Sequence, residues 1–425
     1  MKIKTFLLFS VILASGTIPV RVLAQDADTT QQISGDRYNV PEMENQPYII
    51  LISADGFRHD LADKYKAANL LRLRSKGVYC DFMLPSYPTL TFPNHYTLVT
   101  GLYPAHHGLV DNHFYDPKKQ STYSMSAKFD VGDSSWYGGT PIWTLAEQQH
   151  MITASFYWVG SEAPIGGYTP TYWYHYNTAI PMDQRIQIVK NWLELRPDKR
   201  PHLITFYMPE VDHAEHLYGP DAPQTKEAVQ FVDQSVADLV STVDSLGLNV
   251  NYIFVSDHGM TTVDTVHTLP LPEAIDSTKF IIPPGESLLH LYAKNKSDIK
   301  PTYDKLKATA KDYDVYLAED VPARWHYSKK DDRYNRIGDI ILVPHLPKVF
   351  SIEGRPVHFG EHGFDNALPD MRAIFFAWGP AFLSNVRIRN FENVDLYPLM
   401  AKILGLSYTD KVDGHIGIFR DGLQP

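Results

Sequence analysis

The sequence predicts an α/β protein, an α/β/α sandwich in which helices cover both faces of a mostly parallel central sheet. Continuous apolar runs over residues 47–54, 203–208 and 251–255 are typical of strands buried on both faces. Between these runs lie longer stretches in which apolar residues recur at helical spacing. Alternation of this kind favours parallel strands joined by helices that pack on the sheet.

Two of the predicted helices end at a glycine. One covers residues 60–76 and ends before Gly77, and the other covers residues 224–246 and ends before Gly247. The second helix carries valine and leucine side chains along one face. We therefore expect that face to pack against the sheet.

The pattern changes between Met260 and His362. Strand-like runs and one helix replace the long alternation there, at residues 287–292, 298–312, 315–317 and 340–343. This predicts a small α+β insertion, placed at residues 263–339, that caps one side of the main domain. The main domain would then comprise residues 46–262 and 340–425.

The N-terminus resembles a bacterial secretory signal over residues 1–24. A short basic start precedes an apolar run, and Val22-Leu23-Ala24 supplies the small-residue cleavage site. The apolar run is too short and too interrupted to span a bilayer, so we expect no stable membrane anchor. Residues 25–45 are polar and would form a flexible leader. The protein is therefore expected to be exported, to the periplasm or the medium.

Charge and cysteine content exclude other classes. The formal charge is −10, and loss of residues 1–24, which hold three basic residues and no acidic one, changes it to −13. Proteins that bind long nucleic acid need basic surfaces that replace counterions, so a small-molecule substrate is expected instead. Cys80 is the only cysteine and cannot form an intrachain disulfide. The sequence does not indicate an oligomeric state.

A candidate nucleophile stands at the predicted start of a helix. Thr91 is placed at the N-cap, Pro93 falls in the first turn, and apolar residues follow at helical spacing. Free backbone N–H groups at such a position favour an anion such as a phosphoryl group. Because a threonine hydroxyl attacks poorly unless a base or a metal ion ionises it, metal ligands should lie elsewhere in the chain.

Candidate ligands follow several of the predicted strands. Strand ends suit such a site because ligands of open α/β sheets gather at the carboxyl edge of the strands. Carboxylate and imidazole ligands suit Zn²⁺ or a similar divalent ion, and six of them exceed one tetrahedral site, so two metal ions are implied. The six are Asp55, Asp212, His216, Asp257, His258 and His362.

The order of these motifs resembles the nucleotide pyrophosphatase/phosphodiesterase family of the alkaline phosphatase superfamily, from about residue 47 to the C-terminus. The motifs are Asp55-Gly56, Thr91-Phe92-Pro93-Asn94-His95, Asn112, Asp212 with His216 and Gly219-Pro220, Asp257-His258-Gly259-Met260, and His362-Gly363-Phe364-Asp365-Asn366. The resemblance implies an alkaline-phosphatase-like fold and two zinc ions. It also implies the ligand sets: Asp55, Thr91, Asp257 and His258 for one zinc, and Asp212, His216 and His362 for the other.

The resemblance further implies two displacements at phosphorus. Thr91 attacks to form a phosphothreonine intermediate, which water then hydrolyses, while the two metal ions stabilise the attacking and leaving oxygens. Asn112 would donate its amide to a nonbridging phosphoryl oxygen. Because this donor is uncharged, a nucleotide phosphodiester or phosphoanhydride is favoured as substrate, with a nucleoside 5′-monophosphate as product.

For the nucleoside, the resemblance implies a nucleobase slot made by Phe92 and Tyr176, with Trp158 in a nearby family-like segment. Aromatic stacking tolerates any base, so weak base preference is expected. Three alternatives stay open: a phosphomonoesterase, a phosphodiesterase for choline-type lipid head groups, and a metal-bound binding protein without turnover.

Two residues depart from the family pattern near the second ligand set. Val211 stands where proline is frequent, and Glu215 stands where glycine commonly precedes the ligand histidine. Glu215 would add a carboxylate beside the second metal, where it could alter substrate access. Asp365 and Asn366 are expected to brace His362.

Overall fold

A large mixed sheet forms the centre of the protein in the computed structural model, which describes residues 28–352 and 357–424. The strands β8, β7, β9, β2 and β10 are parallel to one another, whereas β1 and β17 run antiparallel to their neighbours. The mostly parallel sheet is therefore confirmed. Its spatial order is β1 (Gln32–Ile33), β8 (Tyr172–Trp173), β7 (Thr153–Phe156), β9 (Leu203–Met208), β2 (Tyr48–Ala54), β10 (Val250–Val255), β17 (Phe375–Trp378), β3 (Val78–Tyr79) and β18 (Val386–Arg387).

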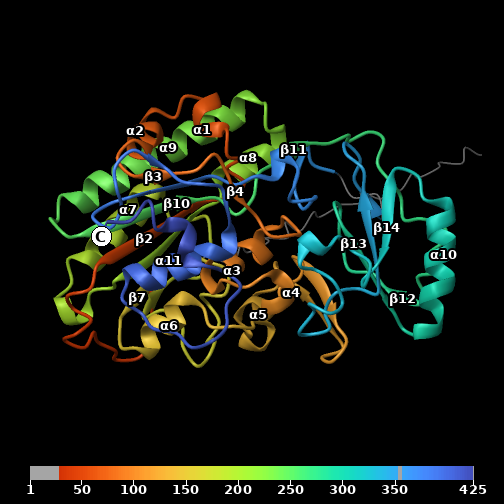
Figure 1. The fold of residues 1–425 in the computed structure, drawn as a ribbon, viewed down its shortest axis with the longest axis horizontal. Helices are drawn as coiled ribbons and strands as arrows, with labels where there is room; N and C mark the ends of the chain where they lie inside the picture. Colours follow the sequence, from red (N-terminus) through yellow and green to blue (C-terminus); the bar gives the residue numbers. More distant parts are fainter. Residues whose placement is uncertain (1–27, 353–356, 425) are drawn as a thin grey trace, which may run out of the picture.

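Helices pack on both faces of this sheet, as predicted (Figure 1). Alternate side chains of β2 divide between two cores: Ile50 and Ile52 contribute to one, and Ile49 and Leu51 to the other. The first face is covered by α1 (Leu61–Lys64), α2 (Ala68–Arg74), α7 (Met182–Leu193), α8 (Glu210–Tyr218) and α9 (Pro223–Asp244). The second is covered by α3 (Thr91–Thr100), α4 (Pro104–His107), α6 (Ile142–Gln148) and α11 (Leu396–Ile403).

The helix predicted over residues 60–76 is wrong as a single element. The chain forms α1 and α2 instead, and Lys66 between them has a left-handed φ of 55°. The break lets Leu61 on α1 and Leu70 on α2 reach the same apolar core. By contrast, α9 matches the helix predicted over 224–246 within two residues.

The nucleophile helix starts one residue earlier than predicted. Leu90 has extended backbone angles and is the N-cap of α3, so Thr91 is the first helical residue. The Asn94 N–H donates to the Leu90 carbonyl oxygen at 3.1 Å, which closes the first turn. Pro93 lies in that turn, as predicted.

The predicted insertion has its own sheet and apolar core, at one end of the molecule (Figure 1). The strand β15 pairs with β13 and β14, although it follows residue 339, so the insertion extends beyond its predicted end. Its elements are β12 (Phe280–Ile281), β13 (Leu289–Ala293), α10 (Ile299–Thr309), β14 (Tyr313–Leu317) and β15 (Ile340–Pro344).

Shorter elements complete the description. The hairpin β5–β6 is followed by α5, and two further strand pairs flank the sheet edge. Their bounds are β5 (His113–Asp116), β6 (Ser121–Ser124), α5 (Lys128–Gly132), β4 (Met83–Leu84) with β19 (Phe391–Glu392), and β11 (Thr261–Thr262) with β16 (Gly360–Glu361).

The N-terminal segment lies along the sheet edge from residue 28 onward. Residues 28–45, part of the predicted leader, include β1, which pairs with β8. The Asn39 amide donates to the carbonyl oxygens of Pro197 and Arg200, at 2.8 and 2.7 Å. The predicted signal, residues 1–24, falls outside the described residues. Within the described part of the chain, no helix is long and apolar enough to cross a membrane.

A buried ion pair ties the insertion to the main domain. Arg336 donates through Nε to Asp116 Oδ2 at 2.8 Å and through Nη1 to the carbonyl oxygens of Gly108 and Trp136, at 3.0 and 2.5 Å. Arg336 and Asp116 are 2% and 3% exposed. Removing one partner would leave the other charge buried without compensation.

We therefore expect Arg336→Met to destabilise the protein strongly. Losing one member of a buried ion pair costs roughly 3–5 kcal/mol, and a thermal melt should show the midpoint falling by several degrees or more. The matched control is Arg387→Met, which removes an exposed pair with Asp81 and should leave the midpoint nearly unchanged. Equal melting temperatures for the two variants would contradict this account.

Candidate active site

The candidate ligands gather at the carboxyl edge of three neighbouring parallel strands, β9, β2 and β10. Asp55 directly follows β2, and Asp257 lies two residues after β10. Asp212 lies in the first turn of α8, just after β9. Because β10 ends at Val255, the chain can turn so that Asp257 and His258 face the same region.

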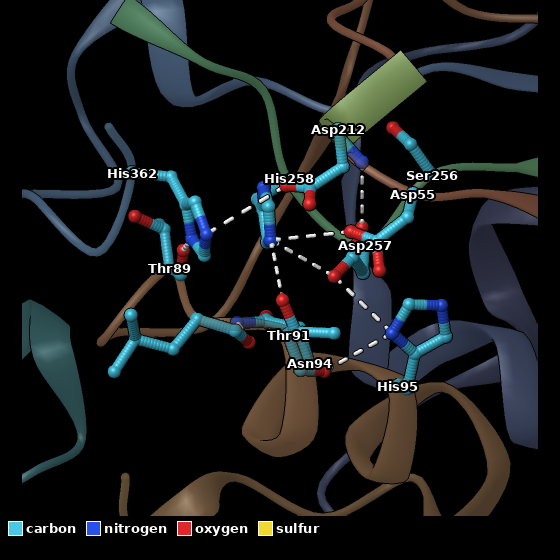
Figure 2. A network of polar contacts seen from close by, with 12 residues as sticks. Asp55, Thr89, Thr91, Asn94, His95, Asp212, Ser256, Asp257, His258 and His362 are labelled. Carbon is cyan, nitrogen blue, oxygen red and sulfur yellow. Dashed lines mark hydrogen bonds and ion pairs between the residues drawn. The ribbon is translucent and has the colours of Figure 1, made fainter. Parts of the chain in front are cut away.

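The first predicted ligand set converges on His258 (Figure 2). Its Nε2 lies 3.0 Å from Asp257 Oδ2, 3.5 Å from Asp55 Oδ1 and 3.2 Å from Thr91 Oγ1. Asp55, Asp257 and His258 are buried, and Thr91 is partly exposed at the start of α3. The candidate nucleophile therefore stands on the open side of a buried cluster of ligand atoms.

The second predicted set lies beside the first. Asp212 Oδ1 is 3.4 Å from His216 Nε2 and 3.8 Å from His362 Nε2. The His362 ring stacks on that of His258 with the centroids 3.7 Å apart. All six predicted ligands and Thr91 thus belong to one continuous site, assembled from residues more than 300 positions apart.

Each of the three histidines is oriented by a backbone carbonyl. Since a carbonyl oxygen can only accept, the Nδ1 atoms of His258, His216 and His362 donate to it, each at 2.9 Å. The acceptors are the carbonyl oxygens of Gly259, Gly360 and Thr89. This leaves Nε2 of every ring directed at the carboxylates, the arrangement that metal-bound histidines adopt.

Buried oxygen atoms without a hydrogen-bond donor indicate what the site holds. Asp55 Oδ1, Asp257 Oδ2 and Asp212 Oδ1 are such atoms. A buried carboxylate oxygen without a donor is costly unless a cation compensates it. Oxygen and imidazole ligands at these positions fit zinc or a similar divalent ion.

The pKa values of the group show how closely its charges are coupled. Burial raises the pKa of Asp55 well above its ordinary value, and Asp257 and Asp212 raise it further. Burial opposes ionisation of Asp257, but His258 and His95 outweigh it and hold the pKa well below the ordinary value. For His216, Asp212 outweighs burial and raises the pKa to about 10. In the absence of metal, this cluster of carboxylates and histidines therefore holds protons. A bound cation would displace them.

Sequence reasoning missed two residues that brace the ligands. The Tyr207 hydroxyl donates to Asp55 Oδ2 at 2.5 Å. His95 Nδ1 lies 3.1 Å from the Thr91 carbonyl oxygen and 3.2 Å from Asp257 Oδ2, while Ser53 contacts its Nε2 at 2.8 Å. His95 therefore connects the backbone of the nucleophile to a ligand carboxylate.

A glycine permits the close approach of two ligand segments. Gly56 has φ of +69°, and a Cβ there would lie 3.0 Å from the Cα of Asp212. Its N–H also donates to Asp257 Oδ1 at 3.2 Å. The Asp-Gly pair after β2 is therefore required by the packing of the site as well as by the turn.

One expectation about neighbouring residues is wrong. Asp365 pairs with Arg324 and the Asn366 amide donates to Pro85, so neither braces His362, whose partner is the Thr89 carbonyl. Glu215 is fully buried, and its carboxylate interacts with the charges of Asp212 and His216, in keeping with the expected place beside the second ligand set. A residue that the sequence did not single out, Glu361, places Oε2 3.6 Å from His216 Nδ1.

The residues predicted to contact substrate differ in exposure. Asn112 Oδ1 accepts from the Phe92 N–H at 3.0 Å, which leaves its Nδ2 free to donate. Tyr176 is half exposed, and its ring lies 6.0 Å from that of Tyr207 beside Asp55. Trp158 is buried and donates to the His95 carbonyl oxygen at 3.0 Å, so it supports the nucleophile helix.

Comparison with known proteins extends this picture. The sequence model of the type I phosphodiesterase/nucleotide pyrophosphatase family matches residues 49–365, which contain Thr91 and all six predicted ligands. The chain belongs to this family. The family consists of metalloenzymes that act as hydrolases, and the candidate metal-binding clusters agree with that membership.

Relatives of this phosphodiesterase family come from distant organisms. An uncharacterised pyrophosphatase/phosphodiesterase of Schizosaccharomyces pombe is 32% identical over 88% of this chain and 80% of its own length. Ectonucleotide pyrophosphatase/phosphodiesterase family member 1 of Mus musculus is 33% identical over 87% of this chain. Venom phosphodiesterase of Naja atra is 32% identical over 88% of this chain. The chain spans 42% of the mouse protein and 46% of the venom protein.

Solved structures confirm the predicted fold class. Human ectonucleotide pyrophosphatase/phosphodiesterase 5 matches with a TM-score of 0.83 and 28% identity, over 89% of this chain and all of the other. The murine protein, as an inactive threonine-to-alanine variant in complex with AMP, matches with the same TM-score, identity and coverage. These enzymes share the alkaline-phosphatase-like α/β fold.

Proposed function

We propose that this protein is an exported, zinc-dependent nucleotide pyrophosphatase/phosphodiesterase that releases nucleoside 5′-monophosphates through a phosphothreonine intermediate. The observation that carries the proposal is the position of Thr91. Its hydroxyl lies 3.2 Å from His258 Nε2, at the first residue of α3 and at the rim of a cluster of buried carboxylates. Hydroxyl, ligands and helix N-terminus are the three components that phosphoryl transfer to a threonine needs.

Two zinc ions are proposed, held by Asp55, Asp257, His258 and Thr91 on one side and by Asp212, His216 and His362 on the other. Bound there, zinc would lower the pKa of a hydroxyl or water and offset the charge of phosphoryl and leaving-group oxygens. His95 would keep the nucleophile beside the first ligand set, because its Nδ1 lies between the Thr91 carbonyl oxygen and Asp257.

Asn112 is proposed to bind the phosphoryl group. Because its Oδ1 accepts from the N–H of Phe92, the residue after Thr91, its Nδ2 is available to donate to a phosphoryl oxygen. A donor fixed by a backbone bond can stabilise charge that develops on a nonbridging oxygen without reorganising. The donor carries no charge, which suits a diester with its single negative charge.

Arg58, the first arginine after Asp55, already forms hydrogen bonds with other groups of the protein. Arg58 donates to Asp60 through Nε and Nη2, and through Nη1 to the Met260 carbonyl oxygen and Asp370. Its guanidinium is therefore committed to protein partners rather than to the second negative charge of a monoester. This supports diesters and phosphoanhydrides over monoesters.

Phe92 and Tyr176 are proposed to bind the nucleobase. Phe92 follows the nucleophile Thr91 in the chain. The ring of Tyr176 packs against that of Tyr207, whose hydroxyl donates to Asp55. AMP in the related murine structure supports a nucleotide as ligand. Three substrates test the proposal: the p-nitrophenyl ester of thymidine 5′-monophosphate, p-nitrophenyl phosphate and p-nitrophenylphosphorylcholine. We expect the first to be hydrolysed best, and preference for either of the others would overturn the substrate assignment.

Removing the Phe92 ring should affect nucleotide substrates selectively. Stacking contributes ~1–3 kcal/mol per base, so Phe92→Ala should lower kcat/KM for nucleotide esters by roughly tenfold or more. Hydrolysis of methyl p-nitrophenyl phosphate, which carries no ring in place of the nucleoside, should change little. Phe231→Ala, which truncates an exposed ring on α9, serves as the control. Equal losses on both substrates would mean that Phe92 positions Thr91 instead.

A further inference from the structure

Two buried side chains of the insertion reach the segment that carries Asn112. His290 lies in β13 and is 2% exposed, and Tyr327 lies in the loop after β14 and is completely buried. Tyr327 Oη donates to the Val110 carbonyl oxygen at 2.5 Å, two residues before Asn112. Neither residue is among the site residues predicted from the sequence.

The hydrogen bonds of this pair have a defined direction. The Gly338 N–H donates to His290 Nδ1 at 3.0 Å, so the ring proton of the neutral imidazole is on Nε2. Burial lowers the pKa of His290 to about 3, which keeps the ring neutral. Nε2 lies 3.1 Å from Tyr327 Oη, so His290 donates to Tyr327, and Tyr327 donates to Val110. Gly338, His290, Tyr327 and Val110 are thus linked by a continuous series of hydrogen bonds.

Asp111 joins the same contact. Its Oδ2 lies 3.5 Å from His290 Nε2, and its Oδ1 accepts from the His113 N–H at 3.1 Å. The Asn112 carbonyl oxygen accepts from the Met125 N–H at 3.0 Å. The backbone on both sides of the Asn112 side chain is thereby fixed, by the insertion on one side and the β5–β6 hairpin on the other.

The insertion also contacts the segment before the nucleophile. The Trp325 ring stacks on that of Tyr87 with centroids 3.8 Å apart, and Tyr327 packs edge-on against Tyr87 at 5.3 Å. Tyr87 precedes Thr91 by four residues. One surface of the insertion therefore contacts both the segment that precedes Thr91 in the chain and the segment that ends in Asn112.

We propose that His290 and Tyr327 are positioning residues, which hold residues 110–112 so that the Asn112 amide faces the phosphoryl group. The proposal rests on the proposed function, because it concerns the phosphoryl ligand Asn112. The Asn112 side chain can accept from the Phe92 N–H and donate to the substrate at the same time only while its backbone stays at a fixed distance from α3. The His290–Tyr327 pair supplies that constraint from the insertion.

A double-mutant cycle tests the proposal. The kcat and KM for the p-nitrophenyl ester of thymidine 5′-monophosphate are measured for the native enzyme, Tyr327→Phe, Asn112→Ala and the double variant. We expect Tyr327→Phe to lower kcat by about three- to tenfold, with little change in KM. In the Asn112→Ala background it should have no further effect, because residues that act through one group are not additive. His290→Gln should show the same dependence on Asn112.

The control is Tyr292→Phe, which removes an equally buried hydroxyl of the insertion that donates to the Arg336 carbonyl oxygen at 2.6 Å. It should leave kcat unchanged. Equal losses from Tyr327→Phe in both backgrounds, or none in the native background, would overturn the positioning role while leaving the phosphodiesterase activity intact. A native enzyme that hydrolyses no phosphodiester would overturn the proposed function, and this inference with it.

Discussion

Replacing Thr91 with alanine should abolish turnover and leave the fold and the metal site in place. Thr91 Oγ1 is the only hydroxyl of the predicted site within 3.2 Å of His258 Nε2 among the described residues. Without it, no covalent intermediate can form, and kcat for a nucleotide diester should fall by roughly a thousandfold or more. The loss should appear in kcat, since the groups proposed to bind the nucleotide remain.

Thr91→Ser provides the complementary test. Serine keeps the hydroxyl and loses only a methyl group, so part of kcat should remain. Thr100→Ala, on the same helix, removes a hydroxyl that donates to the Tyr96 carbonyl oxygen and should affect stability more than kcat. In rapid-quench experiments with a labelled nucleotide, the native enzyme should show phosphate bound to protein and Thr91→Ala should not. Near-native turnover by Thr91→Ala would contradict the mechanism.

The ligand set could be predicted from the sequence because strand ends have a recognisable pattern. Asp55 and Asp257 each follow a continuous apolar run, and parallel strands place such ends at one edge even when they are 200 residues apart. His362 follows no strand of the central sheet. It could be predicted as a candidate from its His362-Gly363 pair, and the family resemblance then assigned it to the second set.

The groups that orient the ligand side chains could not be predicted, and the reason is physical. The Nδ1 acceptors are backbone carbonyls, including that of Thr89, and a carbonyl is present at every residue. Tyr207 lies within β9, where an aromatic residue is indistinguishable from a core residue until the neighbouring strand places Asp55 beside it. Contacts of this kind arise from tertiary packing, which the local pattern does not contain.

The errors in the predicted helices and strands have similar causes. The break between α1 and α2 occurs at Lys66, without a glycine or proline to indicate it. The apolar run of β15 has the composition of a strand of the main sheet, so its assignment to the insertion depends on pairing with β13 and β14. Composition identifies a buried strand but not the sheet to which it belongs.

Metal removal should abolish activity and lower stability together. Asp55 Oδ1, Asp257 Oδ2 and Asp212 Oδ1 are buried and lack hydrogen-bond donors, so loss of the compensating cations leaves these three oxygen atoms uncompensated. We expect the purified protein to contain about two zinc ions per chain and to lose all turnover on treatment with a chelator. Calorimetry should show a lower melting temperature after chelation, and added Zn²⁺ should restore both properties.

His362→Ala separates the two ligand sets. His362 Nε2 faces Asp212 at 3.8 Å, so its loss should weaken the second set and leave the first with all its ligands. We expect about one zinc ion per chain in this variant, measured by atomic emission. His267→Ala, which removes an exposed histidine that pairs with Asp264, should retain two. A native stoichiometry near one, or turnover that survives proven removal of metal, would refute the two-metal site, because a single ion cannot serve both Asp55 with Asp257 and Asp212 with His216.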